Sequence, residues 1–124
     1  MNVHKILIYV ALGWLTFTGS MHFLIDVLSQ YLRHKRAPGP ETTLYYGLNT
    51  AYALSQVLFG VFGLLVARQA LGMWSQWPVI AIGLAATAAW LTFTFLFIAY
   101  REPKIAASVF AVLFLASVLT GLRT

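Results

Sequence analysis

Residues 6–28 read ILIYVALGWLTFTGSMHFLIDVL, and this stretch decides the fold class of the chain. Asp26 is the one Asp, Glu, Lys or Arg in the run, which is 23 residues long. An α-helix rises about 1.5 Å per residue, so the run is long enough to cross a hydrocarbon core about 30 Å thick. The sequence therefore predicts a membrane-spanning helix over these residues.

Three further apolar runs follow the first. They cover residues 48–67, 78–100 and 105–122, with 20, 23 and 18 residues, and each is long enough to span. Backbone groups in lipid must be paired within their segment, and four continuous apolar runs lack the alternation of a membrane β-barrel. The sequence predicts an all-α, polytopic integral membrane protein: a compact antiparallel bundle of four transmembrane helices, with residues 1–124 as a single membrane domain.

The composition of the chain agrees with this class. Of its 124 residues, 60% are hydrophobic and 9% are charged, whereas about a quarter of the residues in a soluble domain are charged. A water-soluble fold of this size could not bury so much apolar surface. The net charge of +5 is clustered between apolar runs, which argues against nucleic acid as a partner. The absence of Cys from the sequence excludes thiolate nucleophiles and thiolate metal sites.

Charged residues mark the connections and indicate the orientation. The longest predicted connection covers residues 29–47 and the shortest covers residues 101–104. Together these two connections hold five Lys or Arg, whereas the opposite side holds three, Lys5, Arg68 and Arg123. The positive-inside rule then favours both termini outside the cytoplasm of a plasma (bacterial inner) membrane, with inverted insertion as the alternative.

Small residues supply the expected helix contacts. The third run carries Ala81, Ala85 and Ala89 at four-residue spacing, and the second carries Gly60 and Gly63. Helices in lipid associate through such close-packing residues. The same residues could pack within the bundle or against a second protomer, so a homodimer or a larger membrane partner stays open.

Polar residues form one stripe on each of the first two helices. Asp26 follows His22 by four residues, so the two side chains stack on one face, which Ser29 and Arg33 continue. The second helix carries a stripe with matching spacing, made of Tyr45, Asn49, Tyr52 and Gln56. If the two faces meet, the stripes line a polar pocket between the first two helices.

The predicted ligand-binding residues are His22, Asp26, Tyr45, Asn49, Tyr52 and Gln56. An imidazole beside a carboxylate can share or relay a proton near neutral pH, which makes His22 and Asp26 candidates for proton coupling. Tyrosine rings and hydroxyls suit a ligand with both apolar and polar parts. The alternative interpretation is structural: the pair satisfies itself and fastens the first helix to Asn49 or Gln56.

The sequence gives few indications of other binding or catalytic sites. Arg33, Lys35 and Arg36 follow the topology rule and are candidates to bind anionic lipid headgroups. One His and one Asp are too few for a metal site, and no Ser-His-Asp arrangement stands out. The sequence therefore predicts no metal, no cofactor and no catalytic residue.

Three functions remain as hypotheses. The favoured one is a small membrane-embedded carrier or binding protein for an amphipathic or lipid-like molecule, working as a homodimer, because the two matched polar stripes need explaining. The second is a non-catalytic subunit or assembly factor of a larger membrane complex, docked through its small-residue faces. The third is an intramembrane enzyme acting on lipid, with His22 and Asp26 as acid and base.

Overall fold

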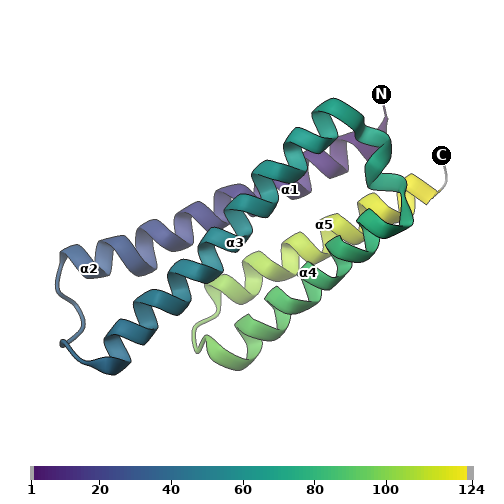
Figure 1. Ribbon diagram of the computed structural model, residues 1–124. Coiled ribbons are helices and arrows are strands. Elements are labelled where there is room, and N and C mark those ends of the chain that lie inside the picture. The colour runs from purple at the N-terminus through teal and green to yellow at the C-terminus, as the bar shows by residue number, and fades with distance from the viewer. Residues whose placement is uncertain (1, 123–124) are drawn as a thin grey trace.

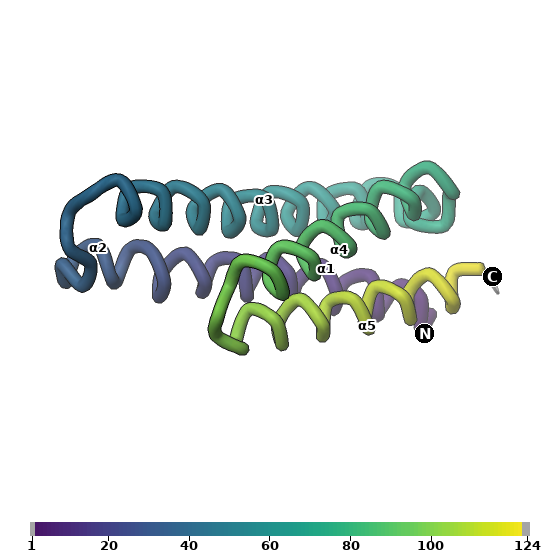
Figure 2. Tube along the Cα trace, turned by 90° about the horizontal axis from the view of Figure 1, so that it is seen from below, coloured from purple at the N-terminus to yellow at the C-terminus, as the bar shows by residue number. Residues whose placement is uncertain are grey.

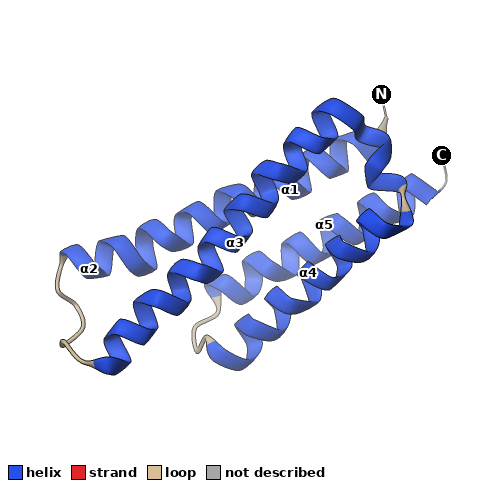
Figure 3. Cartoon of the chain, viewed as in Figure 1, coloured by secondary structure: helices blue, strands red, loops and turns tan. Residues whose placement is uncertain are grey.

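The computed structural model describes residues 2–122, so Arg123, which was counted for the orientation, lies outside the described residues. Within this range the chain is helical apart from short connections and contains no strand (Figure 3). Four helical rods are long and apolar enough to cross a membrane: Val3–Leu32, Pro40–Ser75, Trp77–Phe97 and Glu102–Leu122. The prediction of an all-helical chain with four such segments is confirmed.

The first rod changes its helix type along its length. It consists of α1 (Val3–His22), a π-helical segment η1 (Phe23–Ser29) and the short α2 (Gln30–Leu32). In a π-helix each N–H bonds to the carbonyl five residues back, so the turn is wider than in an α-helix. Asp26 lies at the centre of η1. The stripe predicted at α-helical spacing therefore crosses a different kind of helix.

The first connection is shorter than predicted. Only residues 33–39 lie outside helices, because the first rod continues to Leu32 and α3 (Pro40–Ala70) begins eight residues before the apolar run. His34 adopts a left-handed φ of 51°, and the N–H groups of His34 and Lys35 bond back to helix carbonyls. This Schellman arrangement ends the first rod. Pro40 opens α3, since its missing N–H is not needed in a first helical turn.

The second half of the chain forms a shorter hairpin. After α3 come the 3₁₀ segment η2 (Leu71–Ser75), α4 (Trp77–Phe97) and α5 (Glu102–Leu122). The two described ends of the chain lie at the same end of the bundle (Figure 1). At the other end the hairpin of α1 and α3 projects beyond the hairpin of α4 and α5 (Figure 2). The turn between α4 and α5 therefore lies against the side of the first hairpin.

Glycines make some of the helix contacts, and aromatic rings make others. α1 packs on both α3 and α5, and α4 packs on α5. A Cβ on Gly60 of α3 would meet the Thr16 hydroxyl and, at 3.0 Å, the Leu12 carbonyl oxygen, so α1 and α3 are in close contact there. Large rings instead fill the space between α3 and α4, where Phe59 meets Trp90 with ring centroids 5.4 Å apart.

The small-residue stripe predicted on the third helix does not line an interior contact. Ala85 and Ala89 are exposed on α4, and Ala81 is half-buried. The close contact of α4 with α5 is made elsewhere, at Gly83, where an added Cβ would overlap the Phe114 ring. The alanine stripe is therefore left on the outer surface of the chain.

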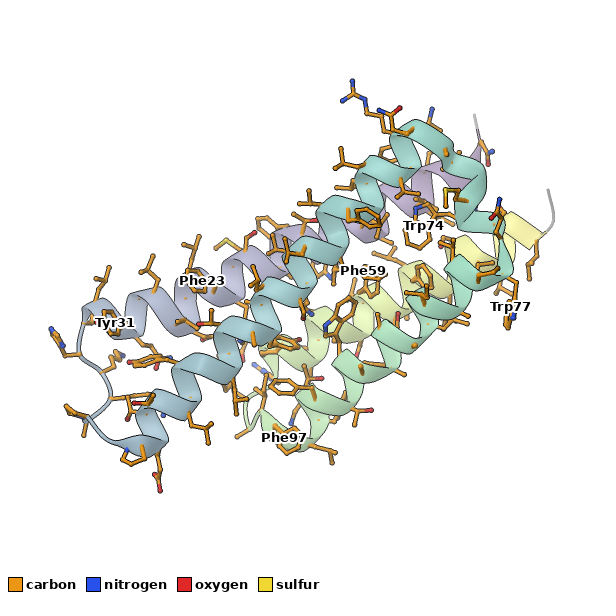
Figure 4. All side chains as sticks on the ribbon, in the orientation of Figure 1. Phe23, Tyr31, Phe59, Trp74, Trp77 and Phe97 are labelled. Atoms are coloured by element: carbon orange, nitrogen blue, oxygen red, sulfur yellow. The ribbon has the colours of Figure 1, made fainter. Side chains whose placement is uncertain are left out.

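Large apolar side chains lie on the outside of the bundle, and several polar residues are buried inside it. Buried polar residues include Asn49 (7% exposed) and Gln56 (3%), whereas Trp77 (69%) and Phe97 (73%) are exposed. Figure 4 shows these two rings at the periphery of the bundle and Phe59 between helices. Exposed large apolar side chains cover the outer faces of all four rods. A chain in water would bury these side chains first.

Candidate functional site

His22, the last residue of α1, is the centre of a buried polar cluster. Its Nδ1 lies 2.9 Å from Oδ2 of Asp26, and its Nε2 lies 2.9 Å from Oδ1 of Asn49 on α3. The His22 residue is 7% exposed, and the side chain of Asp26 is 16% exposed. Asp26 lies in η1, four residues after His22, and its carboxylate lies against the imidazole. The two predicted stripes thus meet through direct side-chain contact.

The bonding of Asn49 fixes where the hydrogens of His22 lie. The Asn49 amide nitrogen donates to the carbonyl oxygen of Tyr45 at 2.9 Å, so the amide oxygen faces His22. Both imidazole nitrogens therefore face acceptors, and Nε2 must carry a hydrogen. Nδ1 lies against the carboxylate of Asp26, so the imidazole connects Asp26 of η1 to Asn49 of α3.

Tyr45 connects this cluster to the end of the first hairpin. Its hydroxyl donates to the backbone carbonyl oxygen of Asp26 at 3.2 Å and accepts from the Gln30 amide at 3.3 Å. The Arg36 guanidinium lies over the Tyr45 ring, 3.4 Å from its centroid, and donates to Gln30 at 3.1 Å. A cation–π contact and a hydrogen bond thus fasten the connection 33–39 to α3 and α2.

Tyr52 and Gln56 extend the cluster towards the middle of the bundle. The Gln56 amide donates to the Tyr52 hydroxyl at 3.1 Å. The Tyr52 ring meets the His22 ring edge-on, with centroids 5.1 Å apart, and stacks on Phe93 of α4 at 4.9 Å. All four residues of the predicted stripe on α3 therefore face other helices, and Tyr52 also links the stripe to α4.

The predicted cationic residues lie in different surroundings. Arg33 is exposed and donates to the carbonyl oxygen of Ser29 in its own rod, at 3.4 Å. Lys35 is exposed, and Arg36 is held by Tyr45 and Gln30. The guanidinium of Arg36 therefore binds other side chains of the protein. A role of the three residues in binding lipid headgroups stays a prediction.

A groove reaches the His22–Asp26 pair from the side of α5. It encloses about 380 Å³, which is within the usual range for small-molecule sites. Its walls come from α1, η1, the α4–α5 turn and the start of α5. The lining residues are Trp14, Thr18, Met21, His22, Ile25, Asp26, Tyr100, Glu102, Pro103, Ile105 and Ala106. Among the predicted site residues, His22 and Asp26 line this groove. The predicted residues of α3 do not line it.

Tyr100 closes the groove beside Asp26. Its hydroxyl oxygen is buried and makes no hydrogen bond to a described residue. Burial, together with the neighbouring Asp26 carboxylate and Tyr45 phenol, raises the pKa of the Tyr100 phenol above its ordinary value. Tyr100 therefore stays neutral at physiological pH. Its hydroxyl is a neutral group beside the carboxylate of Asp26 and the phenol of Tyr45.

A second groove lies on the opposite side of η1 and differs in chemistry. It encloses about 450 Å³ and has an almost wholly apolar lining, made of Ser20, Phe23, Leu24, Thr50, Ala53, Leu54 and Val57. No titratable side chain lines it. This groove suits acyl chains or helix side chains and offers nothing to orient a polar group.

The sequence interpretation missed the α5 side of the site. Trp14 of α1 donates its indole N–H to the carbonyl oxygen of Ala106 of α5 at 2.9 Å, and this bond fastens α1 to α5. Tyr100 of the short turn lies beside Asp26, and Glu102 at the start of α5 lines the same groove. The four-residue turn indicates that the last two helices are neighbours. No pattern in the sequence indicates which earlier helix they pack against.

No known protein family, curated protein or solved structure matches this chain.

Proposed function

We propose that this chain is a small membrane-embedded carrier or binding protein for an amphipathic molecule. The observation that carries the proposal is the groove of about 380 Å³ that ends at the His22–Asp26 pair. An amphipathic ligand needs a largely apolar channel with a few polar groups at one end, and this groove has both. Met21, Ile25 and Ile105 provide apolar walls, and Asp26 and Tyr100 provide polar groups.

The outer surface supports a membrane setting. The four rods are long and apolar enough to span, and large apolar side chains cover their outer faces. Following the positive-inside rule, we assign the connection 33–39 and the α4–α5 turn to the cytoplasmic side of a plasma membrane. The groove then opens near the cytoplasmic interface, where amphipathic molecules collect.

The shape of the groove supports lateral access from the lipid. Ile25 (55% exposed) and Ile105 (54% exposed) stand at its walls and also contribute to the outer surface of the bundle. A ligand could leave its tail among the acyl chains and bring its head to Asp26. This route buries the head without requiring the bundle to open.

A cysteine-protection experiment tests the proposal. Because the natural sequence lacks Cys, Ala106→Cys places a single thiol in the groove wall. The variant is labelled with a neutral maleimide in nanodiscs of phosphatidylcholine. Three single-chain amphiphiles with the same dodecyl tail and trimethylammonium, sulfate or phosphocholine heads are added below solubilising amounts. We expect at least one of them to slow labelling by about tenfold, because an occupied groove excludes the reagent.

Ala99→Cys is the matched control. Ala99 is exposed in the α4–α5 turn and does not line the groove. Its labelling rate should not change with any amphiphile, so a general effect on the bilayer is recognised. If none of the three amphiphiles protects Cys at position 106 relative to position 99, the proposed function is overturned.

A further inference from the structure

The charged groups of the groove are unevenly distributed. Two of the chain's three acidic residues, Asp26 and Glu102, line it, and no Lys or Arg does. Asp26 is already paired with His22, whereas Glu102 makes no salt bridge to any residue in the range 2–122. The nearby Lys104 is directed at α4, where its ammonium lies 5.6 Å from the Phe95 ring centroid. The groove therefore has a carboxylate without a counter-charge.

The donors in the groove are poorly suited to an anion. Both nitrogens of the His22 imidazole are taken, by Asp26 and by Asn49. The Trp14 indole N–H is also taken, by the carbonyl oxygen of Ala106. Tyr100 offers a neutral hydroxyl beside a carboxylate. An anionic head would lose its hydration here without gaining a charged partner.

Aromatic rings complete a surface that favours a cation. Trp14 and Tyr100 both line the groove, and the hydrogen bond of its indole holds Trp14 in place. Ring faces attract ammonium groups, and quaternary ammonium ligands are often recognised in this way. The apolar side chains of Met21, Ile25 and Ile105 continue from these rings to the outer surface.

We infer that the groove selects amphiphiles with a cationic, ammonium-type head, which is held between Glu102 and Asp26 and faces Trp14 and Tyr100. This inference rests on the proposed function and specifies its ligand class. The tail follows the apolar wall towards the lipid. Glu102 supplies the unpaired charge, and Asp26, which is paired with His22, supplies a hydrogen-bond acceptor at the inner end.

The test compares head groups in the Ala106→Cys protein. Dodecyltrimethylammonium should protect the thiol at a concentration at least about tenfold lower than dodecyl sulfate or dodecylphosphocholine, which corresponds to about 1.4 kcal/mol. Protection is compared at equal measured amounts of each amphiphile in the nanodiscs, and Ala99→Cys in the same nanodiscs reports any general effect on the bilayer. Equal protection by all three heads, or better protection by the sulfate, would overturn the inference and leave the proposed function standing.

Carboxylate variants decide whether the selection comes from the groove. Adding Glu102→Gln should reduce the preference for the ammonium head by about three- to tenfold, because the groove loses the one carboxylate that has no partner in a salt bridge, although its exposure limits the effect. Glu41→Gln is the matched control, since Glu41 is the one acidic residue outside the groove and is exposed at the start of α3. If both variants change the preference equally, the inference is wrong. If no amphiphile protects at all, the proposed function fails together with it.

Discussion

Gly60→Leu is expected to separate α1 from α3 and to destabilise the protein by at least about 3 kcal/mol. Even a Cβ at this position would meet the Thr16 hydroxyl, with the Leu12 carbonyl oxygen at 3.0 Å and the Thr16 backbone nitrogen at 3.1 Å. Two of these three contacts are backbone atoms, so no side-chain rotation relieves them. The measurement is the midpoint of thermal unfolding in mild detergent, followed by tryptophan fluorescence.

Gly47→Leu on the same helix is the control. Gly47 is exposed, and a Cβ there would meet nothing within 4 Å. Leucine is a better helix former than glycine by about 0.8 kcal/mol, so this variant should unfold at the same temperature or slightly higher. Similar midpoints for the Gly60 and Gly47 variants would show that α1 and α3 do not meet at Gly60.

Trp90→Ala should lower the free energy of unfolding by about 3–5 kcal/mol. Trp90 is 8% exposed, packs against Phe59 and Phe110 at centroid distances of 5.4 and 5.7 Å, and donates to the Ser55 hydroxyl at 3.0 Å. Because rings, and not closely packed backbones, join α3 to α4, its loss opens a cavity between these helices. Denaturation by a harsh detergent titrated into a mild one measures the effect.

Trp77→Ala on the same helix separates this effect from a general loss of tryptophan. Trp77 is 69% exposed at the start of α4 and contributes no side-chain contact to the core. Its removal should change the free energy of unfolding by less than about 0.5 kcal/mol. A loss at Trp77 as large as that at Trp90 would contradict the aromatic interface between α3 and α4.

Hydropathy predicted the four helices because a run of about 20 apolar residues has few structures open to it other than a membrane-spanning helix. It could not predict that the polar residues 40–47 continue α3, since their helix depends on the proline start and on contacts with η1 such as that of Tyr45. The spacing of polar residues indicated which side chains of α1 and α3 would meet, and His22 does contact Asn49.

The π-helical segment was beyond sequence reasoning. Phe23–Ser29 has the composition of any apolar helix, and the periodicity of side chains cannot reveal one extra residue in a turn. The contact between His22 and Asp26 nevertheless forms at the four-residue spacing that the sequence indicated. The groove was equally hidden, because it depends on α1 packing against α5 through Trp14 and Ala106, which are 92 residues apart.

The alanine stripe of α4 illustrates a different limit. Small residues at four-residue spacing predict close approach of a helix, but they do not identify the partner. In this chain Ala85 and Ala89 are exposed, and the interior contact is made by Gly83 with Phe114. Pattern alone could not distinguish these two faces of one helix.

The imidazole of His22 is directed inward, between Asp26 and the amide of Asn49. Solid-state NMR in lipid bilayers tests this contact directly, with ¹⁵N in histidine rings and ¹³C in asparagine side chains. We expect magnetisation transfer between the ring Nε2 of His22 and the side-chain carbonyl carbon of Asn49, because Nε2 lies 2.9 Å from the oxygen of that amide. The signal should disappear in His22→Gln. A spectrum of the unmodified protein without a transfer that depends on His22 would contradict the claim.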